Sequence, residues 1–140
     1  MRLHIVIIAM IICGPAMAQP ALGEASGTIT GQLSYPSDFI PEDLTICAEE
    51  ISTKKLHCTT RKTRSGKRYS YGLSVPAGEY FVFARTKEMQ GVRAYYSDFV
   101  TCGLDAKCPS HKPIKVVVNS GATAKSINQS ILRIGTLNKV

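Results

Sequence analysis

The segment Leu73-Ser-Val-Pro-Ala-Gly-Glu-Tyr-Phe-Val-Phe-Ala-Arg85 constrains the fold of this chain more than any other. Pro76 fixes its own φ angle and Gly78 has wide conformational freedom, so the first half of the segment is typical of a turn. The second half, residues 80–84, is aromatic, β-branched or small and uncharged, which predicts a strand. Neighbouring side chains of a strand point to opposite faces, so one face carries Tyr80, Val82 and Ala84 and the other carries Phe81 and Phe83. Because both faces are apolar, we expect this strand to be covered on both sides or to offer aromatic residues to a partner.

The first residues, 1–18, have the pattern of a cleaved signal peptide. A positively charged start precedes an apolar run at residues 5–12, and Ala16 and Ala18 supply small residues at a cleavage site. The run is shorter than the roughly 20 residues that a bilayer-spanning helix needs, which argues against a membrane anchor. We therefore expect a mature chain that begins at Gln19 and is periplasmic or secreted.

The mature chain is expected to form one domain. Residues 19–26 are small or polar without periodicity, which predicts a flexible lead-in. Residues 27–134 are enough to build one hydrophobic core, and residues 135–140 are expected to form a tail.

Loss of the signal removes Cys13 and leaves four cysteines, which are Cys47, Cys58, Cys102 and Cys108. An even number of cysteines in an exported chain predicts disulfides. Three connectivities are possible, and the short separations favour Cys47 with Cys58 and Cys102 with Cys108. A metal site is the alternative, but neither pair has the CxxC spacing, and His57 and His111 do not complete a zinc pattern. No metal or other cofactor is expected.

Positive charge is in excess and is concentrated in one segment. Loss of Arg2 leaves 16 of the 17 Lys and Arg residues against 10 Asp and Glu residues. The basic segment, residues 54–68, contains no Asp or Glu and holds Lys54, Lys55, Arg61, Lys62, Arg64, Lys67 and Arg68. Such a segment attracts an anionic partner, such as lipid headgroups, lipopolysaccharide or an acidic glycan. The alternative is a hairpin whose cations keep a sheet edge from pairing with another chain. Nucleic acid is not expected as a partner, because no aromatic residues are interleaved with these cations and the compartment is wrong.

Stretches of alternating or β-rich residues, separated by turn signals, predict the remaining strands. They are residues 28–34, 44–49, 55–60, 67–74, 92–100, 113–118 and 124–134. Residues 61–66 are expected to form a basic loop and residues 102–108 a compact loop closed by a disulfide. The last stretch also fits a helix, because Ile127, Ile131 and Ile134 are spaced by four and three. A strand is favoured because the stretch follows the hairpin signal Asn119-Ser-Gly121.

The predicted pairing of residues 44–49 with residues 55–60 places Cys47 opposite Cys58, where a cross-strand disulfide is geometrically reasonable. The same register places His57 opposite Ala48 on the core face and leaves Leu56 outside. Two explanations remain open: a bulge shifts the register, or the second strand lies at a sheet edge with a poor inner face.

Seven or eight short strands without a convincing helix predict an all-β fold. The expected architecture is an antiparallel seven- to eight-stranded β-sandwich of the immunoglobulin or prealbumin kind, with a closed barrel as the alternative.

This layout resembles the carboxypeptidase-regulatory-like or transthyretin-like domain, a prealbumin-type β-sandwich. The resemblance covers nearly all of the mature chain and rests on Gly27-Thr-Ile-Thr-Gly31, on the turn and strand at residues 75–84, and on Asn119-Ser-Gly-Ala-Thr123. It implies a module for binding or scaffolding. One enzymatic relative, the hydroxyisourate hydrolase, uses a histidine-arginine strand and a Tyr-Arg-Gly-Ser terminus. Neither motif is present, since this chain ends Thr136-Leu-Asn-Lys-Val140, so that activity is not implied.

Catalysis is not expected from the sequence. The serines lack a Gly-x-Ser-x-Gly setting, the cysteines are expected to be bridged, and His57 and His111 lie far apart in the chain. A hydrolase with an unrecognised geometry is kept as a third hypothesis.

Recognition of a partner is the favoured function, and two groups of residues are candidates for it. The aromatic candidates are Phe81, Phe83 and Tyr95, and the basic candidates are Arg61, Lys62, Arg64, Lys67 and Arg68. The first hypothesis is a non-catalytic exported domain that binds an unknown protein or glycan, with the alternative that all the aromatic residues pack in the core. The second is an envelope-associated protein that binds anionic surfaces through residues 54–68.

Overall fold

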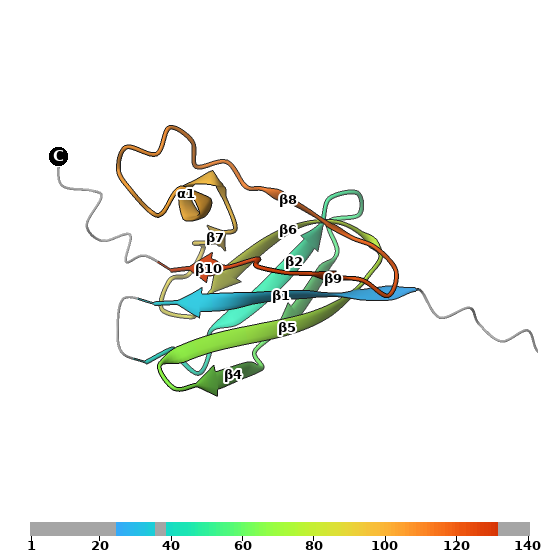
Figure 1. Cartoon of the computed structure of the whole chain (residues 1–140), viewed down its shortest axis with the longest axis horizontal. Coiled ribbons are helices and arrows are strands. Elements are labelled where there is room, and N and C mark those ends of the chain that lie inside the picture. The colour runs from blue at the N-terminus through green and yellow to red at the C-terminus, as the bar shows by residue number, and fades with distance from the viewer. Residues whose placement is uncertain (1–24, 36–38, 132–140) are drawn as a thin grey trace, which may run out of the picture.

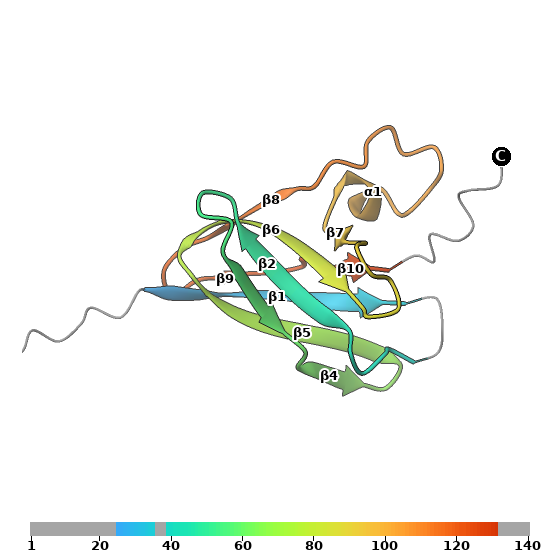
Figure 2. The same cartoon turned by 180° about the vertical axis from the view of Figure 1, so that it is seen from behind.

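The computed structural model describes residues 25–35 and 39–131. Within these residues the fold is all-β, as the sequence predicts, with ten strands in two sheets and one short helix (Figures 1 and 2). The expected signal peptide at 1–18, residues 19–24 of the lead-in and the tail at 135–140 lie outside the described residues. No helix in this described part of the chain has both the length and the apolar character needed to cross a membrane.

Sheet A has five strands, in the order β10-β1-β5-β4, with β9 also paired to β1. The strands are β1 (Ser26–Ser34), β4 (Lys62–Ser65), β5 (Arg68–Pro76), β9 (Thr123–Ala124) and β10 (Gln129–Ser130). The long antiparallel pair of β1 and β5 forms its centre, whereas β9 and β10 run parallel to β1. Sheet A is therefore mixed.

Sheet B also has five strands, in the order β3-β2-β6-β7, with β8 also paired to β6. The strands are β2 (Thr45–Glu50), β3 (Leu56–Thr59), β6 (Gly78–Arg85), β7 (Ala94–Tyr95) and β8 (Lys115–Val118). All pairings in this sheet are antiparallel. The strand predicted at residues 80–84 lies within β6, the central strand of this sheet.

The two sheets share one hydrophobic core. Sheet A supplies Ile29, Leu33, Tyr71, Leu73 and Val75, and sheet B supplies Ile46, Ala48, Tyr80, Val82, Ala84, Val116 and Val118. These side chains follow the predicted alternation. Each fully buried Val, Leu or Ile side chain among them contributes about 1.5–3 kcal/mol to folding. The core is thus built from one face of each sheet.

Both predicted disulfides are present, Cys47 with Cys58 and Cys102 with Cys108, which indicates an oxidising compartment. Cys47 and Cys58 are direct cross-strand partners, and Ala48 faces His57 in an unbroken register. No bulge is present in this pair, and β3 lies at the edge of sheet B. Of the two explanations left open by the sequence, the edge strand is therefore correct.

The strand predicted at 92–100 is wrong beyond Tyr95. Because β8 already pairs with the first half of β6, β7 can pair only with Phe83 and Ala84 at its end. The chain then leaves the sheet and forms a single helical turn, α1 (Asp98–Thr101). This turn leads into the loop that the Cys102–Cys108 disulfide closes.

Two further predictions need correction. Residues 61–66 are not a loop, because Lys62–Ser65 form β4 and Gly66, with a φ angle of 60°, makes the tight turn into β5. In the described part of the single strand predicted at 124–134, two two-residue strands, β9 and β10, are instead separated by a kink at Ser126, whose φ angle is 62°. Residues 132–134 lie outside the described residues. The segment follows β1 closely, as the hydrogen bond from the Ile127 N–H to the Thr30 carbonyl shows.

The carbonyl group of Ile127 joins this last segment to sheet A. The Tyr71 hydroxyl donates a hydrogen bond to it at 2.6 Å. A Cβ atom added at Gly31 would overlap the same carbonyl oxygen. Burial raises the pKa of the Tyr71 phenol above its ordinary value.

Gly31→Ala is expected to lower the free energy of unfolding by about 3 kcal/mol, because the new methyl group must displace the backbone of Ile127. Gly72→Ala on β5 is the matched control, since a Cβ there meets nothing within 4 Å. Urea unfolding of both variants measures the difference. Equal stability of the two would show that the last segment does not pack on β1 as described.

Stability is expected to fall with rising pH above about 10, where Tyr71 ionises in the unfolded chain but stays protonated when buried. The unfolded state then binds fewer protons, so its free energy falls relative to the folded state. Tyr71→Phe should show a shallower decline, together with a loss of about 1 kcal/mol at neutral pH from the missing hydrogen bond. Urea unfolding across pH 8 to 11 checks this, and identical slopes for both proteins would contradict it.

Candidate functional site

The basic segment predicted at 54–68 is divided between two ends of the molecule. Lys54 and Lys55 lie in the turn between β2 and β3, whereas the other five cations lie along β4 and its two connections. At this second end, the ends of β1, β4 and β6 meet the beginnings of β2 and β5 (left in Figure 1, right in Figure 2). We call it the loop end.

A pocket of about 430 Å³ opens at the loop end. Its wall contains three aromatic residues and two cations, which are Tyr35, Phe39, Tyr69, Arg64 and Lys67, together with Leu33, Ser34 and Ile40. No acidic residue is among these described lining residues. We call this cavity the aromatic pocket.

The strand pairing of the β4–β5 hairpin brings the cations and the aromatic rings together. Arg64 is the cross-strand partner of Tyr69, and Lys67 lies in the turn between the two strands. The Arg64 guanidinium lies 5.5 Å from the centre of the Tyr69 ring, and its Nε–H donates to the Gly66 carbonyl at 2.9 Å. One edge of this guanidinium is thus held in place while other N–H groups remain for a ligand.

Lys62 has a different task from the other cations of the segment. Its ammonium group donates to the carbonyl oxygens of Glu42 and Leu44, at 2.9 and 3.2 Å. Since those carbonyls belong to the connection before β2, Lys62 ties residues 40–44 to the edge of sheet A. It shapes the pocket rather than lining it.

The remaining two basic candidates, Arg61 and Arg68, are exposed and do not line the pocket. Of the five predicted basic binding residues, the structure therefore brings Arg64 and Lys67 into one site. The other three lie nearby on the same hairpin and its connections.

The predicted aromatic candidates lie elsewhere, on the outer face of sheet B. Phe83 is fully buried there, because Tyr95 packs beside it and the Arg93 guanidinium lies 4.7 Å from the centre of its ring. Phe83 is therefore corrected from a contact residue to a structural one, since a side chain without exposed surface cannot touch a ligand. Phe81 and Tyr95 are half-buried on this face.

Arg93 is held over Phe83 by an ion pair with Glu49 at 2.6 Å, and it also donates to the Tyr95 hydroxyl at 3.3 Å. Hydrogen bonds to Tyr95 and Glu49 raise the pKa of Arg93, so its charge is fixed. The Arg93 guanidinium is therefore held over the outer face of sheet B.

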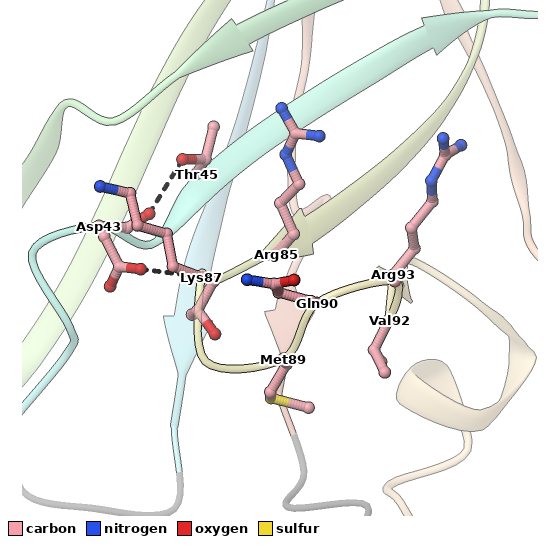
Figure 3. Close-up of a pocket in the computed structure, with 10 residues that line it drawn as sticks. Asp43, Thr45, Arg85, Lys87, Met89, Gln90, Val92 and Arg93 are labelled. Atoms are coloured by element: carbon pink, nitrogen blue, oxygen red, sulfur yellow. Dashed lines mark hydrogen bonds between the residues drawn. The ribbon is translucent and has the colours of Figure 1, made fainter.

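A second cavity, of about 460 Å³, lies beside the start of β2 and the end of β6 (Figure 3). Its polar lining residues come from the start of β2, the end of β6 and the connection to β7, and include Asp43, Thr45, Arg85, Lys87, Gln90 and Arg93. The Arg85 and Arg93 side chains extend in the same direction in Figure 3. We call this cavity the arginine pocket.

The two histidines occupy separate places, and neither has an acid and a hydroxyl as hydrogen-bond partners among the described residues. His57 packs edge-on against Tyr80, with its buried Nε2 unpaired in the described structure. His111 packs against Phe99, near the second disulfide. In residues 25–35 and 39–131, no three His, Cys, Asp or Glu side chains are grouped as metal ligands.

Sequence reasoning missed Tyr35 and Phe39 as site residues, although both flank the proline-containing break after the first strand. The structure marks Phe39 as a candidate contact residue, because this large apolar side chain is 66 % exposed in the folded chain. It also missed Arg85, the last residue of β6, and Gln90, which lies in the connection to β7; neither belongs to a recognisable motif.

Comparison with known proteins gives little to add to this geometry. No family model matches the chain, and no curated protein matches it. The crystal structure of a leucine-rich repeat protein from Bacteroides thetaiotaomicron is similar with a TM-score of 0.43 and 12 % identity, over 78 % of this chain. The matched region spans 14 % of that larger protein.

Lys62→Met is expected to loosen residues 40–44, because it leaves two carbonyls without their charged donor. We expect a loss of about 1–3 kcal/mol in the free energy of unfolding. Faster hydrogen exchange is expected at the Leu44 and Lys87 amides, which bond to Pro41 and Asp43 of this segment.

The control is Arg61→Met, which removes the same charge from the preceding, exposed residue. If both variants have the same stability and exchange rates, Lys62 does not hold the segment.

Proposed function

We propose that this chain is an exported, non-catalytic domain that binds an acidic glycan in the aromatic pocket. The observation that carries the proposal is the composition of one cavity, where Tyr35, Phe39 and Tyr69 meet Arg64 and Lys67 without a described acidic neighbour. Aromatic rings offer apolar faces to sugar rings, and guanidinium groups bind carboxylates through paired hydrogen bonds. Both chemistries are needed for a charged sugar.

The proposed fold class is the carboxypeptidase-regulatory-like or transthyretin-like β-sandwich. Tyr80 supports an immunoglobulin-like arrangement, because its hydroxyl donates to the Pro76 carbonyl at 2.8 Å, four residues upstream, as in a tyrosine corner. Two segments of the family resemblance also meet, since the Thr28 N–H donates to the Ala122 carbonyl. Binding modules of this kind carry recognition on loops at one end of a rigid scaffold.

A concave pocket favours a glycan over a flat anionic membrane. A membrane-binding surface needs several protruding apolar groups among its cations, whereas Tyr35 and Tyr69 are half-buried in the wall of a cavity. Envelope attachment through residues 54–68 is the alternative, and it predicts that all cations of the β4–β5 hairpin act alike.

The test compares two double variants with equal charge changes. Arg64→Gln/Lys67→Gln alters the aromatic pocket, and Arg61→Gln/Arg68→Gln alters exposed cations of the same region outside it. Calorimetric titration with hexagalacturonate should show roughly a tenfold or greater loss of affinity for the first and about a twofold loss for the second. Neutral maltohexaose should bind neither the parent protein nor the variants.

If the two double variants lose the same affinity for hexagalacturonate, binding is a general attraction of anions to the basic surface and not a defined glycan site. The same conclusion follows if the parent protein binds anionic vesicles more tightly than it binds hexagalacturonate. Absence of any binding of hexagalacturonate to the parent protein would reject the proposal. Circular dichroism of each variant ensures that the fold is retained.

A further inference from the structure

We propose that the arginine pocket is a second acidic-group subsite for the same glycan, so that the domain selects chains with several acidic groups over single acidic sugars. This inference rests on the proposed function of the aromatic pocket and extends the site across residues 40–44. The inference rests on the unpaired cations of the arginine pocket and on residues 40–44, which contribute to the walls of both cavities.

The arginine pocket contains charged hydrogen-bond donors that have no acidic partner among the described residues. Arg85 is exposed at the end of β6 and has no ion pair with any described residue, and the Lys87 ammonium is likewise unpaired in the described chain. The Gln90 amide lies by the base of the Arg85 side chain, and the Arg85 guanidinium extends away from it (Figure 3). Guanidinium and ammonium groups without an acidic partner suit a carboxylate or sulfate group.

The one acidic residue among the described lining residues of this cavity accepts a hydrogen bond from the chain itself. Asp43 Oδ2 accepts a hydrogen bond of 2.7 Å from the Lys87 N–H (Figure 3). Arg93 is engaged with Glu49. Arg85 and Lys87 are therefore the cations available to a ligand, and they outnumber the single carboxylate of the wall.

The two cavities are neighbours. Ile40 lines the aromatic pocket and Asp43 lines the arginine pocket, so their walls are joined by three peptide units. A fully extended chain spans at most roughly 3.3–3.6 Å per residue, which limits the separation of these two Cα atoms to about 11 Å. The Leu44 N–H bonds to the Pro41 carbonyl, so this part of the segment turns and is shorter still. A short oligosaccharide is long enough to span this shared part of the wall.

Joining two acidic groups in one chain changes the binding thermodynamics. Once the first group is held in the aromatic pocket, the second binds the arginine pocket at a high effective concentration. The gain appears only for ligands long enough to span residues 40–44. Affinity should therefore rise with chain length, and the rise should depend on Arg85.

The experiment measures galacturonate and hexagalacturonate binding by NMR titration, a method that covers weak and moderate affinities. The proteins are the parent chain, Arg85→Gln, Lys87→Gln, Arg64→Gln and the exposed control Arg68→Gln. The hexamer should bind the parent roughly tenfold or more tightly than the monomer. Arg85→Gln should remove most of that gain, Lys87→Gln should remove part of it, and Arg68→Gln should retain it. A sulfated maltohexaose, which carries sulfate groups but no carboxylate, distinguishes sulfate from carboxylate as the preferred group in a parallel titration.

The outcomes separate the two proposals. If Arg64→Gln weakens both ligands but Arg85→Gln and Lys87→Gln leave the hexamer affinity intact, the aromatic pocket is a single subsite and this inference is wrong. Equal affinity of monomer and hexamer for the parent would also overturn it. If the parent protein binds neither the uronate ligands nor the sulfated ligand, both the proposed function and this inference are wrong.

Discussion

The ammonium group of Lys62 organises the end of the molecule where recognition is proposed. By donating to the Glu42 and Leu44 carbonyls, it fixes residues 40–44, a connection into sheet B, against the edge strand of sheet A. An edge strand is a liability because its backbone invites pairing with other chains, and a basic side chain is a common protection. Here one lysine protects the edge and also builds the wall between two cavities. The basic segment therefore combines the structural contacts of Lys62 with the binding role proposed for Arg64 and Lys67.

The scaffold behind this end leaves little room for adjustment. Both sheets feed a single core, a disulfide joins β2 to β3 at the edge of sheet B, and the Ile127 carbonyl is held by Tyr71. On the outer face of sheet B, Arg93 and its ion pair with Glu49 cover Phe83. Rigid elements hold side chains in fixed positions, so these contacts give the loop end a fixed base. The outer face, in contrast, has its aromatic surface largely closed.

Much of the scaffold could be predicted from local patterns, because alternation and cysteine spacing act over few residues. The core face of β6 and the pairing of Cys47 with Cys58 both follow from such patterns. The failures have non-local causes: β7 ends early because β8 occupies the same edge of β6, and Phe83 is buried because Arg93 reaches across to Glu49. The aromatic pocket joins three separate segments of chain, so the sequence could name its cations but could not assemble it.

The most direct test of this account is a ¹H–¹⁵N NMR map of the protein titrated with hexagalacturonate. The account predicts shifts concentrated at the amides of the two cavities, at Tyr35, Lys67 and Tyr69 on one side of residues 40–44 and at Lys87 and Gln90 on the other. Amides on the outer face of sheet B, such as those of Phe81 and Val117, should not move. Shifts confined to that outer face, or spread evenly over all exposed cations, would contradict a defined glycan site at the loop end.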